Sequence, residues 1–541
     1  MQRGNMQLYC CYAVLFIHAL MLLLSAYFWI CEWYSKDNRY FSFFLSKPIK
    51  FFQKWTIIFS SIIFLIFLYV VFTSYNSSDN LTSSNPNRFF LTDSLSFWFN
   101  FIVAVISCVV SFHCKVYTDF ENDKNEDNTT LYQTAKFYTL YHAFIITMYL
   151  VQISSNLIVL CIAMELTTLS STLLVCHNRS EKSVEAAWKY VNICSIAIIF
   201  SLIGILLLLF IFVVPEDATL NITELINYSN ELNEKKDIIF KISFLFIFIG
   251  FGTKAGLAPL HSWLPDSHAE APSPISALLS GVLLKTSFYA ILRFYQVISK
   301  HMEDMKFFNT MLLIAGFISI VIAVPFIIKK QENFKRILAY HSLNHMGIIL
   351  FATGIATKFS LVAALLHSFY HALTKSLMFM AHGSALMACQ GSSKKNSAMK
   401  PLLKMPIYGF MIALGGFALV GSPPFAIFTT EFTIFVEAAK ELTFYGGGFL
   451  TAFYLISLVS IFGGLTNHIA EWIFIGQGAN DGCSNEEVDN DDSNEEMKNQ
   501  QFFNIIPLIF LFILIVFFGF WHLKNFDIIL NKSCELLRIG L

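Results

Sequence analysis

Apolar residues in this sequence occur in long runs, and short polar or charged stretches separate the runs. A helix that crosses the hydrocarbon core of a bilayer needs about 20 consecutive apolar residues. Fourteen windows have this character, and the predicted spans cover residues 9–30, 55–74, 96–114, 136–151, 155–176, 189–213, 238–258, 274–297, 308–328, 337–356, 359–388, 405–438, 447–470 and 503–522. The first window lacks a basic leading region and a small-residue cleavage site, so we expect a retained helix rather than a signal peptide. The pattern predicts an all-α, multi-pass integral membrane protein of about fourteen transmembrane helices.

Lysine and arginine in the short loops set the expected orientation, because positive residues stay on the cytoplasmic side. The basic loops alternate with polar or acidic ones, which predicts that both chain ends lie outside the cytoplasm. Residues 476–500 are acidic and rich in asparagine and serine, so we expect a disordered linker there, on the cytoplasmic side. The expected organisation is a set of N-terminal transmembrane helices over 1–130, a core over 131–475, this linker, and a C-terminal transmembrane helix over 501–541.

The composition fits a lipid-embedded chain and excludes several classes of function. Hydrophobic residues make up 56% of the 541 residues and charged residues 13%, against roughly 25% charge in soluble domains. The formal net charge of −1 gives no field that would attract nucleic acid. The 11 cysteines are scattered, without a C-x-x-C pair or a cysteine–histidine cluster, so neither a metal site nor a cofactor is expected.

Four predicted spans each carry a lone charge near the middle or at a break, at Glu165, Lys254, Lys285 and Glu431. An ionised side chain at the bilayer centre costs at least about 2.5–3.5 kcal/mol on insertion scales, so each of these residues is a candidate functional residue. Burial and an opposite charge shift the proton affinity of lysine and glutamate in opposite directions. A Glu165–Lys254 pair could therefore act as a switch that holds a proton on the lysine and then releases it.

Histidines supply further candidate proton carriers. His367, His371 and Lys375 follow one another at i, i+4 and i+8, which places them on one stripe of one helix. His341 and His345 lie on the preceding predicted span. Such a stripe of titratable groups can pass protons laterally through a membrane domain.

Each of these residue types also has a simpler interpretation. A lysine or arginine near a span end often extends to the interface, which is a second possibility for Lys241 and Arg293. His142 and His341 could be hydrogen-bonded packing residues, and Glu431 could cap a broken helix. The histidine pair of the stripe has the spacing of metal ligands, but the sequence offers no obvious third ligand.

Glycine and proline interrupt two of the spans directly beside a buried charge. Residues 250–260 (GFGTKAGLAPL) surround Lys254, and residues 421–432 (GSPPFAIFTTEF) lead into Glu431. Transporters often place their ion path at such breaks in two internal repeats. Residues 155–297 and 337–470 are the candidate repeat units.

The run GTKAGLAPLHSWLPDSHAEAPSPISALLSGVLLKTSFYAILRF over 252–294 closely resembles the signature of the antiporter-like proton-translocating family. That family includes the large membrane subunits of respiratory complex I, membrane subunits of energy-converting hydrogenases such as hydrogenase-4, and subunits of multisubunit sodium/proton antiporters. The resemblance extends over roughly residues 90–470 and is closest to the hydrogenase-4 and complex I chain M type. It implies fourteen helices with two inverted five-helix repeats, each holding a half-channel around a broken helix.

The resemblance also implies roles for the candidate residues. Glu165 and Lys254 look like the coupled Glu–Lys pair of the family, and Lys285 looks like its central lysine. The stripe looks like the connecting helix, and Glu431 looks like the terminal proton-exchange residue. One departure is Asn344, which stands where the hydrogenase-4 type often has a glutamate before His345.

The leading expectation is a proton-translocating subunit of a respiratory NADH:quinone oxidoreductase or an energy-converting hydrogenase, without a redox centre of its own. Its expected partners are other membrane subunits and the lipid bilayer, its ion is the proton with sodium as the second possibility, and its expected location is the bacterial cytoplasmic membrane. A second interpretation is a subunit of a multisubunit sodium/proton antiporter. A third is a membrane enzyme acting on a lipid-linked substrate through His261, Asp266, His268 and Glu270, but no nucleophile or metal constellation accompanies those residues.

Overall fold

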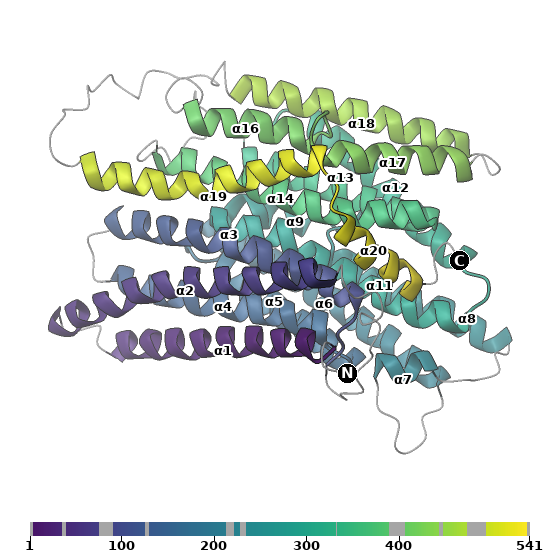
Figure 1. Cartoon of the computed structure of the whole chain (residues 1–541), viewed down its shortest axis with the longest axis horizontal. Helices are drawn as coiled ribbons and strands as arrows, with labels where there is room; N and C mark the ends of the chain where they lie inside the picture. The colour runs from purple at the N-terminus through teal and green to yellow at the C-terminus, as the bar shows by residue number, and fades with distance from the viewer. Residues whose placement is uncertain are drawn as a thin grey trace.

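A computed structural model describes residues 4–34, 39–74, 90–124, 129–212, 221–227, 234–331, 333–388, 406–442, 447–472 and 494–537. Nearly all of these residues are helical, and their only β-type pairings are two isolated bridges. The long helices run side by side along one common direction, with α1 and α18 at opposite edges and the shorter α20 crossing obliquely (Figure 1). The prediction of an all-α protein is confirmed for the described residues.

The helices have the following bounds. The long ones are α1 Gly4–Tyr34, α2 Arg39–Ser74, α3 Ser94–Lys124, α4 Thr129–Ile153, α5 Leu157–Val175, α6 Glu181–Ile211, α8 Glu234–Lys254, α11 Leu284–His301, α12 Lys306–Ile328, α13 Phe334–Ile355, α14 Lys358–Ala388, α16 Pro406–Leu419, α17 Ala426–Glu441, α18 Gly447–Ala470 and α19 Asn494–Phe520. The short ones are α7 Ile222–Asn227, α9 Trp263–Glu270, α10 Ser273–Leu278 and α20 Lys524–Leu537, and a π-helical segment, η1 Leu279–Leu283, joins α10 to α11.

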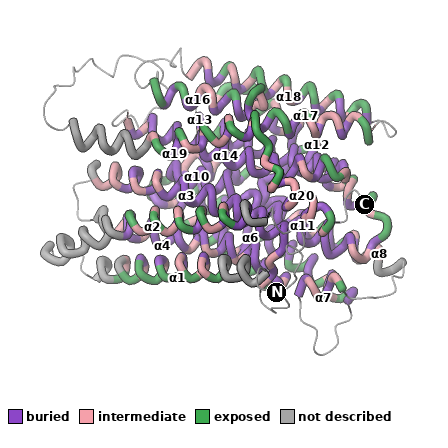
Figure 2. The backbone as a smooth tube through the Cα atoms, in the orientation of Figure 1, coloured by how far each residue is buried: buried purple, intermediate pink, exposed green. Residues whose placement is uncertain are grey.

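Seven helices in the described part of the chain are long and apolar enough to cross a bilayer, and α19 with α20 makes an eighth if that pair is one span bent by 78°. The chain is therefore a multi-pass integral membrane protein. Helices at the edges, such as α1, α16 and α18, carry exposed residues along one side, whereas the interior is buried (Figure 2). Phe210 on α6 and Phe449 on α18 are 75% and 69% exposed, as expected for side chains that face lipid.

The interior contains helices that are buried on every side. The continuous stretch Ser273–His301, which comprises α10, η1 and α11, is buried throughout its apolar window. On α13 and α14 almost every described side chain is buried as well. These central helices carry most of the candidate ionisable residues, so the charges lie within protein and away from lipid.

Close helix packing holds the centre together. In α12 and α13, a Cβ added to Gly316 would come within 2.4 Å of the backbone nitrogen of Phe351, and one added to Gly354 would come within 2.3 Å of that of Leu313. Small residues of this kind let the backbones of two membrane helices approach, where dispersion contacts stabilise their association.

Both of the expected helix breaks are present. α8 ends at Lys254 and α9 begins at Trp263, while the single span expected over 405–438 is divided between α16 and α17. The π-helical segment and the bend into α20 are further irregularities that the hydrophobic pattern did not predict. α19 begins at Asn494, within the segment expected to be a linker, and residues 473–493 lie outside the described residues.

Candidate functional site

The first cluster of candidate residues joins α5 to the end of α8. The Lys254 ammonium is fully buried and donates to the backbone carbonyl of Met164 and, at 2.5 Å, to the Thr168 hydroxyl. The Glu165 carboxylate accepts a hydrogen bond from Ser195 at 2.6 Å and one from Thr168 at 3.4 Å. Thr168 therefore stands between the amine and the carboxylate.

The expected Glu165–Lys254 pair is thus bridged rather than direct. The ion pairs within 4.0 Å in the described ranges do not include one between these two residues. Lys254 is the last residue of α8, where unpaired carbonyl groups and the helix dipole favour a cation. The sequence therefore places the charge at the one point of this helix where the backbone stabilises it.

Lys285 lies at the start of α11, directly after the π-helical segment. Its ammonium donates to the carbonyl oxygen of Ser280 at 2.5 Å, and the Ser280 hydroxyl contacts that of Ser342 on α13 at 2.8 Å. Single π-helical turns inside α-helices occur frequently at functional sites. Lys285 is 1% exposed, so the segment presents a buried amine in the middle of the bundle.

The histidine stripe lies on α14, as predicted. The rings of His367 and His371 are 6.5 Å apart between centroids, and the Lys375 ammonium donates to the carbonyl oxygen of Leu338 on α13. The segment that precedes Lys285 packs against α14, since a Cβ added to Gly281 would lie 2.8 Å from the Ser376 hydroxyl oxygen. Lys285 therefore follows a segment that contacts the helix of the stripe, but no hydrogen bond among the described residues joins it to a stripe residue or to Lys254.

A second cluster forms where α13 and α14 meet α17. His345 Nδ1 lies 3.0 Å from His367 Nε2 and 4.0 Å from Glu431 Oε1, and the three donor atoms lie within 4.8 Å of one another. His367 Nδ1 is 2.9 Å from the Thr430 hydroxyl. His345, which follows Asn344 in the sequence, thus contacts both His367 of the stripe and the Glu431 carboxylate.

The break before α17 positions the Glu431 carboxylate. Gly421 has a φ of +68°, which favours glycine. A Cβ at that position would lie 2.1 Å from Glu431 Oε2. Two separate features therefore require glycine at position 421. The backbone has a positive φ, and the Glu431 carboxylate occupies the space that a Cβ would need.

Several polar atoms in and beside the second cluster are buried without a protein partner in the described part of the chain. Both ring nitrogens of His341 and of His371, Nε2 of His345 and Oδ1 of Asn344 make no hydrogen bond within the described part of the chain. Leaving such an atom unsatisfied costs about 1–3 kcal/mol. Buried polar groups of this kind commonly bind ordered water, which would also conduct protons.

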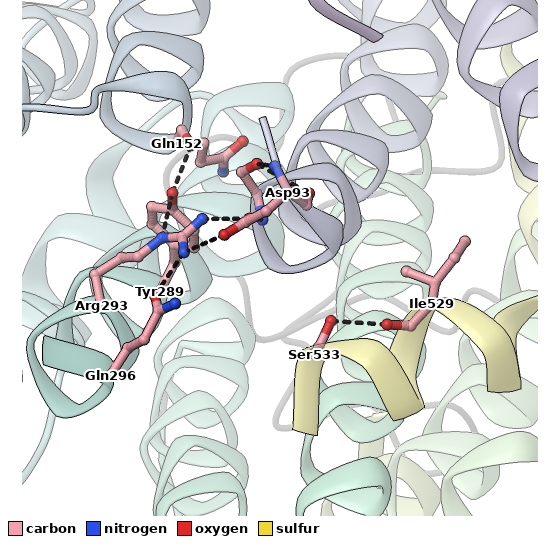
Figure 3. Close-up of polar contacts among 8 residues, drawn as sticks. Asp93, Gln152, Tyr289, Arg293, Gln296, Ile529 and Ser533 are labelled. Atoms are coloured by element: carbon pink, nitrogen blue, oxygen red, sulfur yellow. Dashed lines mark hydrogen bonds and ion pairs between the residues drawn. The ribbon is translucent and has the colours of Figure 1, made fainter. Parts of the chain in front are cut away.

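An ion pair that the sequence did not reveal lies between α3 and α11. Arg293 donates to both carboxylate oxygens of Asp93, at 2.6 and 2.5 Å, and also to Tyr289 and Gln296 (Figure 3). Arg293 is 0% exposed, so the interpretation that it extends to the membrane interface is wrong. The sequence signal that could have indicated this pair is an acidic residue, Asp93, shortly before a predicted span. In the structure Asp93 also accepts a hydrogen bond from the backbone N–H of Ser96.

His142 and Lys241 have the simpler roles that their positions allow. His142 contacts His18 and Thr56, each at 3.2 Å, which fits a packing residue. Lys241 is only half-buried and its amine lies 5.9 Å from the ring centre of Phe307, which fits a side chain directed to the interface.

The residues of the lipid-enzyme interpretation do not form a site. Asp266 accepts from Arg336 at 2.8 Å and lies 3.4 Å from Lys189, so it ties α9 to α13 and α6. No hydrogen bond joins Asp266 to His261, His268 or Glu270, all of which the structure describes. The geometry therefore gives that interpretation no support.

Comparisons with known proteins agree with the geometry. A family model described as "NADH:quinone oxidoreductase/Mrp antiporter, TM" matches residues 154–457. The hydrogenase-4 component F homolog of Methylacidiphilum infernorum is 34% identical over 65% of this chain and 73% of its own length. A Na(+)/H(+) antiporter subunit of Alkalihalophilus pseudofirmus is 28% identical over 58% of this chain and 59% of its own length.

A solved structure extends the similarity to nearly the whole fold. The membrane-bound sulfane sulfur reductase, an archaeal respiratory membrane complex, contains a chain with a TM-score of 0.75 and 20% identity. The match covers 97% of this chain and 98% of that one. At this level of identity the match establishes the fold alone, and it includes the N-terminal helices that precede the family match.

Proposed function

Because the chain belongs to the NADH:quinone oxidoreductase/Mrp antiporter transmembrane family, we propose that it is a proton-translocating subunit of a respiratory membrane complex of the NADH:quinone oxidoreductase or energy-converting hydrogenase type. Its partners would be the other membrane subunits of that complex, and its location the bacterial cytoplasmic membrane. It would supply the proton path, and the redox centres would belong to those partners.

The observation that carries this proposal is the presence of two separate polar clusters within the helix bundle, built around the buried residues Lys254 and Glu431. One contains Glu165, Thr168 and Lys254, and the other contains His345, His367 and Glu431. Each lies beside a helix break, which is where transporters place their ion paths. Lys285 and the two remaining residues of the stripe, His371 and Lys375, would connect the two clusters.

In this mechanism the first cluster holds and releases a proton. An approaching Glu165 carboxylate would stabilise the charged form of Lys254, and its withdrawal would leave burial to favour the neutral amine. The released proton would pass by way of Lys285, His371 and Lys375 toward His345. Glu431 would exchange it at the far end.

We also propose fourteen membrane crossings, arranged around two inverted five-helix repeats. Helices α4, α8, α13 and α14 are not among the eight apolar spans, and the last three carry Lys254, Lys375 and the candidate histidines. Their polarity is what a proton path requires. The eight apolar spans, these four helices, α1 and the pair α16–α17 together give the fourteen proposed crossings.

The test compares two lysines of the same helix. The complex that contains this chain is purified, reconstituted into liposomes and assayed for proton uptake with a pH-sensitive dye. Lys254→Ala is expected to abolish uptake, whereas Lys241→Ala, at the half-buried position, is expected to leave it unchanged. Unimpaired uptake in Lys254→Ala would reject the proposal.

Membership of a sodium/proton antiporter complex is the second candidate, and the similarity to the Alkalihalophilus antiporter protein favours it. The proteins that co-purify decide between the two. Iron–sulfur or hydrogenase-like subunits are expected for the redox complex, whereas a set of small membrane subunits without redox centres would favour the antiporter.

A further inference from the structure

Three potential metal ligands from three helices converge beside the break before α17. They are His345 of α13, His367 of α14 and Glu431 of α17, and their donor atoms lie within 4.8 Å of one another. Two imidazoles and a carboxylate are a donor set that zinc and similar ions bind in proteins. We propose that these three residues bind a divalent transition-metal ion of the zinc class, and that the bound ion blocks proton transfer at this point. The blocking effect rests on the proposed function, whereas the binding site does not.

The spacing of the donor atoms fits such an ion. Zinc–nitrogen and zinc–oxygen bonds of about 2.0–2.1 Å in a tetrahedron place neighbouring donors roughly 3.3 Å apart. The observed separations are 3.0 Å from His345 Nδ1 to His367 Nε2 and 4.0 Å from His345 Nδ1 to Glu431 Oε1. All three pairs of donor atoms lie within 4.8 Å, so a movement of the Glu431 side chain by about an ångström toward the two imidazoles would complete a three-ligand site with one open position.

Thr430 fixes His367 in the tautomer that a metal needs. The Thr430 hydroxyl donates to the carbonyl oxygen of Ile427 at 2.8 Å, so its oxygen remains as the acceptor for His367 Nδ1 at 2.9 Å. The proton of His367 then lies on Nδ1, and Nε2 presents a lone pair to the cluster. Metal-bound histidines almost always have their second nitrogen anchored in this way.

The other two ligands are also free to bind an ion. His345 can carry its proton on Nε2, which has no partner in the described part of the chain, and so expose Nδ1. Lys285 and Lys375, the buried amines of the central region, donate to backbone carbonyl groups and form no ion pair with Glu431. The carboxylate is therefore not neutralised by either lysine.

The side of the cluster that faces the helix break is its least buried side. His345 and His367 are at most 1% exposed, but Glu431 retains 6%, and the adjoining Pro423 and Pro424 are exposed. An ion would therefore reach Glu431 first and then the two imidazoles. Bound there, it would occupy the nitrogen and oxygen atoms that a proton must use to pass from the stripe to the carboxylate.

The test measures Zn²⁺ affinity of the purified, detergent-solubilised complex by competition with a chromophoric chelator. We expect binding of one Zn²⁺ ion per chain that weakens roughly 100-fold or more in His367→Gln and in Glu431→Gln, because each loses a direct ligand. Thr430→Val, which removes only the anchor of His367, should weaken it about 10–100-fold. His382→Gln is the matched control, because His382 is also buried on α14 and takes no part in the cluster.

The outcomes separate the site from the proposed function. Absence of Zn²⁺ binding in the wild type, or equal losses in His382→Gln and His367→Gln, would overturn the metal site. Unfolding temperatures of all variants identify any loss that comes from misfolding, and Thr430→Val retains all three ligands. In liposomes, Zn²⁺ should inhibit proton uptake, and Thr430→Val should require about 10–100-fold more Zn²⁺ for half-inhibition. If the complex binds Zn²⁺ at these residues and moves no protons, the site stands and the proposed function fails.

Discussion

Replacing Asp93 by asparagine is expected to destabilise the folded chain by about 3–5 kcal/mol, the cost of removing one partner of a buried ion pair. Arg293 is 0% exposed and binds both carboxylate oxygens, at 2.5 and 2.6 Å. Its guanidinium cannot lose its proton, so it stays charged after the carboxylate is gone. The remaining partners, Tyr289 and Gln296, are neutral and cannot compensate that charge.

The free energy of unfolding can be followed by equilibrium denaturation in mixed detergent micelles. Glu185→Gln is the matched control, because it makes the same chemical change in an exposed ion pair with Lys189 and should have no measurable effect. The double variant Asp93→Leu/Arg293→Met should be more stable than Asp93→Asn, since apolar residues of similar volume often replace a buried pair without loss. If Asp93→Asn unfolds with the free energy of the wild type, the assignment of this pair as a structural anchor is refuted.

Three further substitutions test the packing and the site. Gly421→Ala should abolish proton uptake while the protein still assembles, because the new methyl group would lie 2.1 Å from Glu431 Oε2 and displace the carboxylate. Thr168→Val should lower the rate of proton uptake at least about tenfold, through loss of the hydroxyl that joins the first cluster, and Thr168→Ser should restore it. Gly354→Ala should destabilise the chain by about 1–3 kcal/mol, measured by the same denaturation assay, because its methyl group would lie 2.3 Å from the backbone nitrogen of Leu313.

The glycine and threonine substitutions each have a control. Gly448→Ala on α18 should be harmless in both assays, because nothing lies within 4 Å of the added Cβ. Thr172→Val removes a hydroxyl one turn after Thr168 that donates only to its own helix, and should leave proton uptake unchanged. Equal effects of Thr172→Val and Thr168→Val would show that the hydroxyl bridge is not part of the path.

Features that depend on local sequence were predictable. The break at Gly421 follows from the glycine and the two prolines after it, because these residues cannot continue a helix without loss. The histidine stripe follows from a spacing of four residues, which the helix itself converts into a common face. In both cases the relevant residues lie within one or two helical turns of one another.

Features that depend on distant contacts were not predictable. Asp93 and Arg293 are 200 residues apart in the chain, and nothing in either span identifies the partner. The convergence of His345, His367 and Glu431 depends likewise on how α13, α14 and α17 pack. The sequence offered His367 with His371 as possible metal ligands, whereas the structure brings His367 together with His345 and Glu431, which are distant in the chain.

The buried cations of α8 and α11 differ in whether they can release a proton. Arg293 is held by a planar, bidentate contact and keeps its charge permanently, which suits an anchor. Lys254 and Lys285 each end a flexible four-carbon chain and can release a proton, which suits carriers. Both lysine-bearing helices contact Met164 of α5, since Ser287 Oγ of α11 lies 3.8 Å from Met164 Sδ and Lys254 of α8 donates to the Met164 carbonyl. In the proposed path, proton transfer between the two amines would use the flexible lysine side chains or water. Arginine at either lysine position is therefore expected to keep the charge and stop the proposed transfer.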